Sequence, residues 1–402
     1  MATETHVRGA DLFDKCRDFT TAKEIIAKGI YPYFKPLSSE SDTEVEVDGK
    51  RVIMIGSNNY LGLTTHPLVK EAAIAAIRKY GTGCTGSRFL NGTLKIHEEL
   101  EGRLAAFLKR EAALVFSTGF QANLGAISAL GSKDDTIFID RQDHASIVDG
   151  CRLSFAKTVK YRHNDVSDLE RLLASSNGHG GKFVVVDGVF SMEGDLADLP
   201  GIVAASKRHG ARVMVDEAHS LGVFGANDRG TVEHFGLEKE VDLVMGTFSK
   251  SFAAVGGVIA STADVVHFIK HNGRSMIFSA SMPPGVVASV LAALGIIEKE
   301  PERRERLWAI VRKMKAGFQE MGFNTGHSDS PVIPIIVGED QMAFRAWKAL
   351  FDEGVFANSA VSPAVPPGMA LLRTSYMATH TDAQLDRVLE TFRKVGKSLG
   401  II

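Results

Sequence analysis

One lysine stands alone in a stretch that otherwise carries no charge. Between Leu243 and Ala263 the only charged side chain is Lys250, and its neighbours are small, hydroxylic or apolar. A dry pocket of such residues lowers the pKa of a lysine, and a neutral amine forms a Schiff base with an aldehyde. Cofactors that carry a carbonyl group, such as pyridoxal phosphate (PLP), need such a lysine. Taken alone, the stretch fits a solvated lysine at a loop tip better, so other parts of the chain must supply further groups.

A carboxylate and a histidine follow a second apolar run. The run leads from Val213 into Asp216, and His219 comes three positions later. A carboxylate at the end of a buried strand is costly unless it meets a positive charge or hydrogen-bond donors. A protonated pyridine nitrogen is such a partner, and the ion pair would keep the ring an electron sink. Asp216 could instead cap a helix, but the presence of Lys250 further along the same sheet favours a PLP site.

Two further strand ends carry groups that suit a phosphate or a ring. Phe116 is followed by S-T-G-F-Q-A-N at 117–123 and then by a helical pattern. Backbone N–H groups at such a helix start can bind phosphate, although an ordinary helix cap explains this segment better on its own. His144 comes just after a strand that is expected to end at Asp140. A lone histidine there is more often a structural hydrogen-bonding residue than a catalyst.

A glycine-rich segment imitates a nucleotide-binding motif. Gly81, Gly83 and Gly86 match the dinucleotide fingerprint G-x-G-x-x-G. That fingerprint has meaning only where it follows a strand and opens a helix. Here it follows a helix expected over 67–80 and continues into a loop over 87–93. The segment therefore indicates tight turns near a ligand rather than a nicotinamide site.

The elements that must position these residues alternate between strands and helices. Short apolar runs separated by helical patterns predict an α/β fold with a mostly parallel sheet that is covered on both faces. Ligands of such sheets bind at the carboxyl ends of the strands. The expected strands lie at 112–116, 136–140, 183–187, 212–216, 242–245 and 255–260.

Three regions are expected along the chain. Residues 1–50 form an N-terminal helical arm and a strand, residues 51–285 form a large α/β domain that binds the cofactor, and residues 286–402 form a small α+β domain. Within these regions we expect a helix over 11–28, strands over 331–337 and 370–375, and an amphipathic helix over 381–399.

Composition excludes several classes of protein. The 402 residues carry a formal net charge of −2 and are 45% hydrophobic, which argues against a nucleic-acid partner and for a large core. Cys16, Cys84 and Cys151 lie far apart, so no disulfide framework or metal-ligand spacing is expected, and a reducing cytoplasm fits. The chain begins without a signal-peptide pattern, and no run is long and apolar enough to predict a transmembrane helix.

Several motifs together resemble one enzyme family. D-E-A-H-S-L-G-V-F-G at 216–225 and G-T-F-S-K-S-F-A-A-V-G-G at 246–257 are similar to the α-oxoamine synthases, PLP enzymes of aminotransferase fold type I. S-N-N-Y-L-G-L, F-S-T-G-F-Q-A-N-L, D-H-A-S-I-V-D-G and L-L-R-T-S add to the resemblance in the expected order. The resemblance covers nearly the whole chain. It implies PLP and the type I fold, with a small C-terminal domain beside the large one.

The resemblance also implies a reaction. S-R-F-L-N-G-T-L-K-I-H-E-E-L-E at 87–101 and D-E-A-H-S are similar to bacterial members that condense L-serine with a long-chain acyl thioester and release CO2 and a 3-ketoamine. These enzymes are homodimers with a shared active site, and the thioester is carried by coenzyme A or by an acyl carrier protein. The resemblance thus implies a cytoplasmic enzyme. It decides neither whether the enzyme contacts the inner membrane nor how long the acyl chain is.

Other members of the family remain alternatives. They use glycine or alanine, and they include 8-amino-7-oxononanoate synthase, 5-aminolevulinate synthase and 2-amino-3-ketobutyrate ligase. Outside this group, a nicotinamide oxidoreductase would rest on the glycine-rich segment alone. A non-catalytic partner subunit would lack the Schiff-base lysine, whereas Lys250 is present.

The resemblance assigns roles to matching residues. Lys250 would carry PLP as an imine and remove the Cα proton, Asp216 would pair with the pyridine nitrogen, His219 would contact the ring hydroxyl, and the catalytic His144 would stack on the ring. The residues implied around the phosphate are Ser117, Gly119, Phe120, Thr247 and, from a partner subunit, Ser279. Those implied for the amino-acid carboxylate are Asn59 and Arg373.

One position departs from the family pattern. Some bacterial members carry a second arginine in the loop before the L-L-R motif. Here Val361 stands at that place, within A-V-S-P-A-V-P-P-G. How this chain holds the serine carboxylate during the reaction is therefore left open by the sequence.

Overall fold

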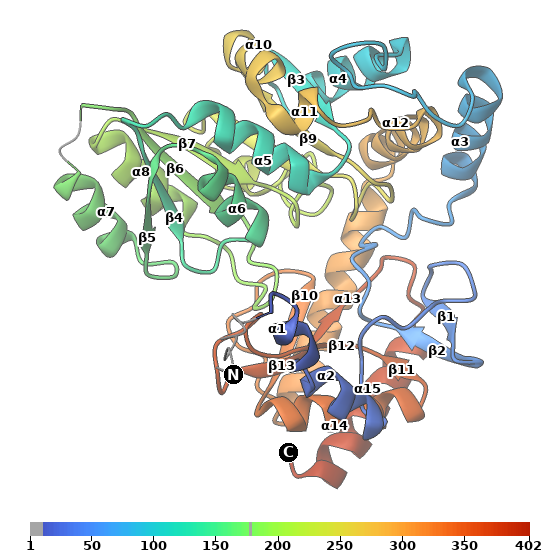
Figure 1. Ribbon diagram of the computed structural model, residues 1–402. Coiled ribbons are helices and arrows are strands. Elements are labelled where there is room, and N and C mark those ends of the chain that lie inside the picture. Colours follow the sequence, from blue (N-terminus) through green and yellow to red (C-terminus); the bar gives the residue numbers. More distant parts are fainter. Residues whose placement is uncertain (1–10, 177–178) are drawn as a thin grey trace, which may run out of the picture.

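A seven-stranded sheet forms the centre of the larger lobe in the computed structural model, which describes residues 11–176 and 179–402 (Figure 1). The strand order is β3-β9-β8-β7-β6-β4-β5. Strands β5 to β8 and β4 run parallel, whereas β9 runs antiparallel to both β8 and β3. The strands are β3 (Ala112–Phe116), β4 (Thr136–Asp140), β5 (Lys157–Tyr161), β6 (Lys182–Asp187), β7 (Ala211–Asp216), β8 (Leu243–Thr247) and β9 (Gly257–Ser261). The predicted α/β fold is thereby confirmed.

Helices cover both faces of this sheet, and this explains the continuous apolar runs of its strands. Every residue of β4, β8 and β9 is buried. Because successive side chains of a strand point to opposite faces, Leu114 packs in one hydrophobic cluster and Val115 in the other. The helices of this lobe are α3 (Pro67–Tyr80), α4 (Lys95–Phe107), α5 (Gly119–Leu130), α6 (Ala145–Leu153), α7 (Val166–Ser175), α8 (Leu199–Arg208), α9 (Thr231–His234), α10 (Ala263–Asn272), α11 (Arg274–Ile277) and α12 (Pro284–Lys299).

A smaller lobe holds two three-stranded sheets (Figure 1). One sheet pairs β1 (Glu44–Val47), β2 (Lys50–Met54) and β11 (Val355–Phe356), and the other has the order β10 (Val332–Gly338), β13 (Ala370–Ser375), β12 (Asn358–Ala360). The helices that pack with them are α13 (Pro301–Glu320), α14 (Asp340–Asp352) and α15 (Asp382–Leu399). Sequence patterns had predicted β10, β13 and α15 within one or two residues of these bounds.

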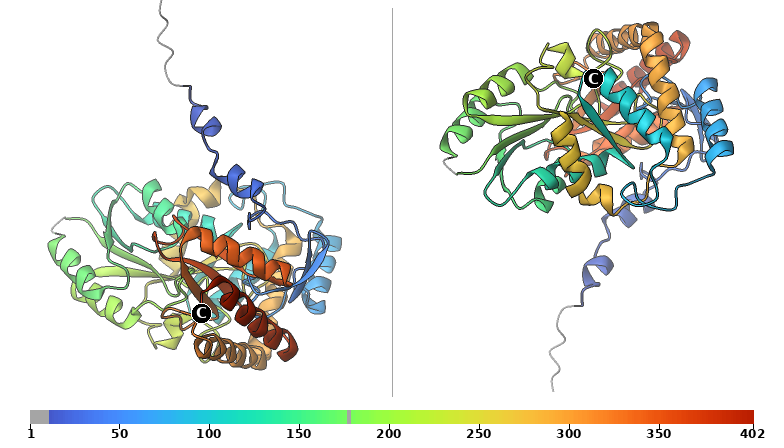
Figure 2. Two further views of the ribbon diagram at one scale, coloured as in Figure 1. Left: turned by 90° about the horizontal axis from the view of Figure 1, so that it is seen from below. Right: turned by 90° about the horizontal axis from the view of Figure 1, so that it is seen from above.

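The N-terminal arm differs from the single helix expected over 11–28. It contains two short helices, α1 (Asp14–Arg17) and α2 (Thr21–Ala27), which are separated by residues 18–20. None of their residues is buried. The two helices extend away from the body of the molecule (Figure 2), so the apolar spacing in this segment does not serve packing within its own chain.

The domain boundaries at residues 50 and 285 remain predictions. The structure adds that β2 pairs with β1 on one side and with β11 on the other, so the segment around residue 50 lies with the C-terminal strands. Residue 285 is the second residue of α12. Gly81 ends α3 with a φ of 86°. A helix and not a strand therefore leads directly into the glycine-rich segment, which supports the rejection of a dinucleotide site there.

No helix within residues 11–176 and 179–402 combines the length and the apolar character that a membrane crossing requires. No group of three or more His, Cys, Asp or Glu side chains in the same ranges is arranged to hold a metal ion.

Candidate active site

Neighbouring strands of the large sheet end in polar residues at one edge. β6 ends at Asp187, β7 ends at Asp216, and these two residues are paired in the sheet register. β8 ends at Thr247, and Lys250 follows it by three positions. Because parallel strands place their carboxyl ends on the same side, side chains from separate sequence motifs meet at this edge.

The loop that carries Lys250 is anchored by two aromatic side chains. Phe248 and Phe252 are fully buried, and their rings lie 5.6 Å apart. Lys250 lies between these two residues in the sequence and is partly buried. Burial lowers the pKa of its amine to about 7, with the carboxylates of Asp216 and Asp187 opposing this effect. A large neutral fraction near pH 7 is what a nucleophilic or basic amine requires.

A cavity of about 280 Å³ lies at this edge of the sheet. We refer to it as the inner cavity. Seven of the predicted site residues line it: Gly119, Phe120, His144, Asp216, His219, Thr247 and Lys250. They come from four different motifs, so the structure brings most of the sequence-predicted site into one space.

Asp216 is held at the floor of the inner cavity by hydrogen-bond donors. Its side chain is buried, Asn123 Nδ2 donates to Asp216 Oδ2 at 2.7 Å, and Ala218 N donates to Asp216 Oδ1 at 2.9 Å. Asn123 is itself fixed, because its Nδ2 also lies 2.8 Å from Ser146 Oγ. These donors hold the carboxyl group in place, and a carboxylate in this position can pair with a protonated pyridine nitrogen.

Two histidines flank the same cavity. His144 is the N-cap of α6, its backbone N donates to Asp187 Oδ2 at 2.8 Å, and its ring is exposed. An exposed aromatic ring beside the cavity can cover a planar ligand. His219 is buried, and its Nδ1 lies 2.7 Å from the hydroxyl of Tyr60. Burial, together with the positive charges of Lys250 and Arg373, lowers the pKa of His219 well below its usual value.

The start of α5 and two nearby hydroxyl groups also line the inner cavity. The helix begins at Gly119 and is capped by Thr118, whose hydroxyl accepts from Gln121 N at 3.1 Å. A Cβ on Gly119 would stand only 2.6 Å from Thr247 Oγ1, so the backbone and this hydroxyl are in close approach. Ser249 Oγ lies 3.0 Å from the same oxygen. Free N–H groups of a helix start and two hydroxyls match the needs of a phosphate.

The structure does not bring the hydroxyls of Ser117 and Ser279 to this cavity. Ser117 Oγ donates to the backbone oxygen of Ala280, and Gln121 Nε2 donates to Ser279 Oγ at 3.0 Å. Neither residue lines the inner cavity of its own chain. The expectation that Ser279 serves a partner subunit is compatible with this position, and both assignments remain predictions.

A second cavity, the outer cavity, has a volume of about 600 Å³ and adjoins the first. The two share the lining residues His144, Ser191, His219 and Lys250. The outer cavity adds Arg373 and the loop that contains Val361. A molecule in the outer cavity would therefore reach Lys250.

Arg373 is buried in β13 and oriented by two acceptors. Its Nε donates to Ser191 O at 2.6 Å and its Nη2 donates to Asn58 Oδ1 at 2.9 Å. It is 5% exposed, yet no carboxylate pairs with it among the residues that the structure describes. A buried guanidinium without a counter-ion beside a cavity is suited to a carboxylate ligand.

Asn59 lines neither cavity, and its predicted role at the carboxylate stays a prediction. Its Nδ2 donates to Thr64 Oγ1 at 2.7 Å, and its Oδ1 accepts from Leu63 N at 2.9 Å. The side chain in contact with Arg373 is that of Asn58. Asn59 had been assigned from the family resemblance, and its Nδ2 also lies 3.5 Å from Met377 Sδ.

Asp187 is a site residue that the sequence interpretation missed. It lines the inner cavity, and burial and the charge of Asp216 raise the pKa of its carboxyl well above its usual value. The same signal that identified Asp216, an acidic residue at the end of an apolar run, was present at 183–187. Asp187 fixes the backbone of His144 and so helps to position that ring.

The fold and the site define a class of protein. A profile of the family described as Aminotransferase class I and II matches residues 50–392, and the chain belongs to this family.

Within this family, the chain is similar to individual enzymes over nearly its whole length. The chain is 51% identical to the serine palmitoyltransferase of Sphingobacterium spiritivorum, over 97% of this chain and 98% of that protein. It is 43% identical to the 8-amino-7-oxononanoate synthase of Thermoanaerobacter pseudethanolicus, over 96% of this chain and 98% of that protein. A lysine-to-alanine variant of the serine palmitoyltransferase from S. paucimobilis, solved with a bound PLP–myriocin aldimine, superposes with a TM-score of 0.94 at 40% identity, covering 98% and 100% of the two chains.

Proposed function

We propose that this chain is a serine palmitoyltransferase. It condenses L-serine with a long-chain acyl thioester, releases CO2 and a free thiol, and forms 3-ketodihydrosphingosine in the first step of sphingolipid biosynthesis. The observation that carries the proposal is the near-complete similarity to serine palmitoyltransferases, on a chain in which Lys250 lines both an inner cavity with Asp216 and an outer cavity with Arg373.

PLP is the cofactor, and the residues of the inner cavity fit it. The N–H groups at the start of α5, with Thr247 and Ser249, suit the phosphate, while the buried carboxylate of Asp216 suits the pyridine nitrogen. Lys250 supplies the amine for the carbonyl carbon. When bound, PLP supplies an electron sink for the electron pair that is left on serine Cα.

The protein groups then divide the work of binding and proton transfer. Arg373 holds the serine carboxylate, with its guanidinium oriented by Ser191 and Asn58. Lys250 removes the Cα proton, which its lowered pKa of about 7 allows near neutral pH. Asp216 keeps the pyridine nitrogen protonated, because an opposite charge raises the pKa of that group. His144, which lines both cavities, would stack on the ring.

We also infer a homodimer that acts in the cytoplasm. The support for a dimer is the family resemblance and the position of Ser279 outside its own inner cavity. The support for the cytoplasm is three cysteines without a disulfide.

The reaction is tested with purified protein, each small amino acid and a panel of acyl thioesters, with the product mass as the readout. Serine with a long-chain thioester should give the highest kcat/KM, and Lys250→Ala should abolish both turnover and the borohydride-reducible PLP linkage. A higher kcat/KM for glycine or alanine would refute the serine assignment. PLP fixed to another lysine in the variant would refute the role of Lys250.

A second candidate function is another decarboxylative condensation of the same family, with 8-amino-7-oxononanoate synthase as the example. The observation in its favour is Val361, which lines the outer cavity where some serine-specific members have an arginine. A site that hydrogen-bonds the serine hydroxyl should reject alanine strongly, because its polar groups would be left unpaired. The ratio of kcat/KM for serine and alanine therefore separates the two functions.

A further inference from the structure

A buried tyrosine lies behind His219, on the side away from the inner cavity. Tyr60 is 0% exposed, and its hydroxyl lies 2.7 Å from His219 Nδ1. The other ring nitrogen of His219, Nε2, makes no hydrogen bond with the described protein atoms, and the ring lines the inner cavity together with Asp216 and Lys250. The contact made at Nδ1 therefore decides what Nε2 can offer to a ligand.

The surroundings of the Tyr60 hydroxyl determine which group donates. Within residues 11–176 and 179–402 its second polar contact is Asn58 Oδ1 at 3.5 Å, well beyond the usual distance for an O–H donor. That oxygen already accepts from Arg373 Nη2 at 2.9 Å. A guanidinium has no acceptor atom, so Arg373 cannot accept a hydrogen bond from the Tyr60 hydroxyl either. His219 Nδ1 is the one well-placed acceptor.

The protonation states of both groups agree with this direction. Burial raises the pKa of Tyr60, and the nearby Arg373 offsets that only in part, so the phenol keeps its proton near neutral pH. His219 is neutral there, because burial and the charges of Lys250 and Arg373 lower its pKa. A neutral imidazole carries one N–H, and a bond accepted at Nδ1 places it on Nε2.

We propose that Tyr60 is a positioning residue whose hydroxyl donates to His219 Nδ1 and thereby fixes the Nε2–H form of that ring, facing the inner cavity. With PLP bound, that N–H would be available to the ring oxygen of the cofactor and would stabilise negative charge there. This assignment rests on the proposed PLP site, and it adds a residue that acts through His219 rather than by contact with the cofactor.

The test uses PLP-loaded protein labelled with ¹⁵N at histidine, with the His219 signals assigned by their loss in His219→Asn. The wild-type protein should show a protonated Nε2 and an unprotonated Nδ1. A proton on Nδ1 overturns the proposal, and this result is independent of which amino acid or thioester is the substrate. The measurement on the wild-type protein stands even if Tyr60→Phe does not fold.

Two variants add readouts that a purely structural residue would not change. Tyr60→Phe should lose the fixed His219 form, raise the share of the PLP absorption band that reports a neutral ring hydroxyl, and lower kcat about tenfold with little change in the serine KM. Tyr376→Phe is the matched control, because this equally buried hydroxyl bonds to Thr374 Oγ1 at 3.1 Å. An unchanged spectrum in Tyr60→Phe, or an equal shift in Tyr376→Phe, overturns the proposal.

Discussion

Lys250 is a titratable group whose charged form the folded protein disfavours. Its pKa of about 7 lies below the value of about 10.4 for a free lysine. Between these values the unfolded chain binds the proton and the PLP-free folded protein does not, so stability rises with pH through this window. Below about pH 7 both states are charged, and the full cost of burying the ammonium falls on the folded state.

The first prediction concerns this cost. In PLP-free protein, Lys250→Met should raise the urea midpoint of unfolding, because a methionine fills similar space without a charge. The gain should be largest at pH 6 to 7 and should disappear toward pH 10.5, which unfolding curves at several pH values will measure. Lys270→Met on the exposed face of α10 is the control and should have little effect. A gain of equal size at every pH would contradict the assigned cause.

The second prediction concerns Arg373. Arg373→Ala should raise the serine Kd by roughly 10- to 100-fold, since a charge-assisted pair with a carboxylate is worth about 1.5–3 kcal/mol. Spectral titration of bound PLP with serine measures the Kd, and steady-state kinetics measure the thioester KM, which should change far less. Arg393→Ala on exposed α15 is a matched loss of charge. Equal effects on both substrates would place Arg373 in a structural role.

At the scale of residues, sequence identified those whose chemistry stood out from their surroundings. Lys250 was visible because no other charge lies between Leu243 and Ala263, and Asp216 because it ends an apolar run. Asn58 and Tyr60 carried no such signal. Their roles follow from the direction in which one turn points its side chains, and that direction is set by residues far away in sequence.

The loop between β7 and α9 depends on a buried carboxylate that has no part in the cavity. Glu217, which follows Asp216, is 0% exposed and accepts hydrogen bonds from Thr231 N at 2.8 Å, Thr231 Oγ1 at 2.7 Å and Val232 N at 2.7 Å. Ser220 Oγ donates to it as well. Glu217, the second residue of D-E-A-H-S, therefore fixes the start of α9.

The third prediction follows from the fact that all these partners are donors. Glu217→Gln replaces one acceptor oxygen by an NH2 group, which would face donors, so the free energy of unfolding should fall by about 1–3 kcal/mol. Urea unfolding of the PLP-loaded protein measures the loss. Glu99→Gln on the exposed face of α4 is the control and should be nearly neutral. A loss no larger than that of the control would show that the four donors find other acceptors.

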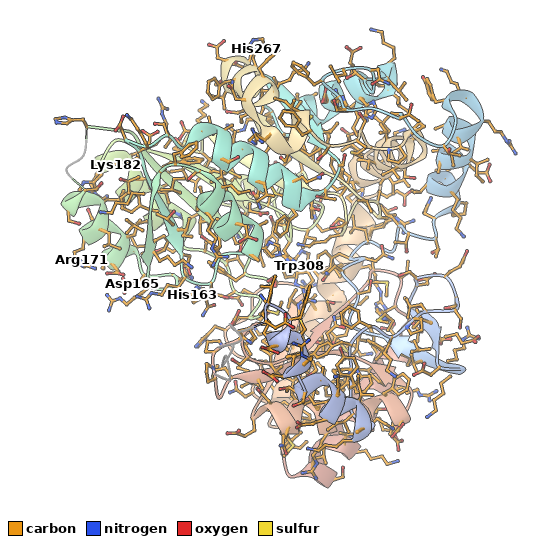
Figure 3. All side chains as sticks on the ribbon, viewed as in Figure 1. His163, Asp165, Arg171, Lys182, His267 and Trp308 are labelled. Carbon is orange, nitrogen blue, oxygen red and sulfur yellow. The ribbon has the colours of Figure 1, made fainter. Side chains whose placement is uncertain are left out.

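His163 joins three segments at the edge of the large sheet (Figure 3). Its Nδ1 lies 3.0 Å from Asp140 Oδ1 at the end of β4, and its Nε2 lies 3.1 Å from Asp195 Oδ2 in the loop after β6. Burial disfavours the charged ring, but the hydrogen bonds to the two carboxylates outweigh it and raise the pKa of His163 to about 10. The imidazolium is thus part of the folded protein across the neutral range.

The fourth prediction is the pH dependence of this bridge. A folded pKa near 10 stands above the unfolded value of about 6.5, so the contribution is complete below pH 6.5 and is lost as the pH rises to 10. His163→Gln should therefore lower the free energy of unfolding by about 1–3 kcal/mol at pH 6 and by much less at pH 10. Urea unfolding at both pH values, with exposed His327→Gln as control, measures the difference. An effect that does not change with pH would contradict the ionic bridge.

At the scale of elements, the buried strands were predictable and the exposed ones were not. The six strands expected in the large sheet are present, because burial on both faces demands continuous apolar runs. β5 was missed: its sequence K-T-V-K-Y forms an edge strand in which only Tyr161 is fully buried. The arm at 11–28 was expected as one helix, because helical spacing alone does not reveal that nothing in the same chain covers its apolar side.

At the scale of the whole molecule, the N-terminal arm exposes apolar side chains that its own chain does not cover. Leu12, Phe13, Phe19 and Ile26 on the N-terminal arm are 55–70% exposed, and Phe34 just beyond it is 94% exposed. The arm extends from the body in both views of Figure 2. A continuous set of exposed aromatic and aliphatic side chains indicates a protein interface. In a twofold dimer the same surface serves both subunits, and each subunit can supply groups to its partner's site.

The last prediction is that Ser279 contributes to the inner cavity of the partner subunit and not to that of its own subunit. If each inner cavity combines Lys250 of one subunit with Ser279 of the other, a subunit with Lys250→Ala and a subunit with Ser279→Trp are both inactive in pure dimers. In a mixed dimer, one cavity has both defects and the other has neither. Denaturing and refolding an equal mixture with PLP should then restore about one quarter of wild-type activity, because half of randomly paired dimers are mixed and each has one intact site. If Ser279 acted within its own subunit, every cavity would retain one defect and the mixture would stay inactive. Ser279→Ala adds no bulk and serves as a control. It removes only the hydroxyl that lies 3.0 Å from Gln121 Nε2, so it should change the PLP affinity more than it changes the free energy of unfolding.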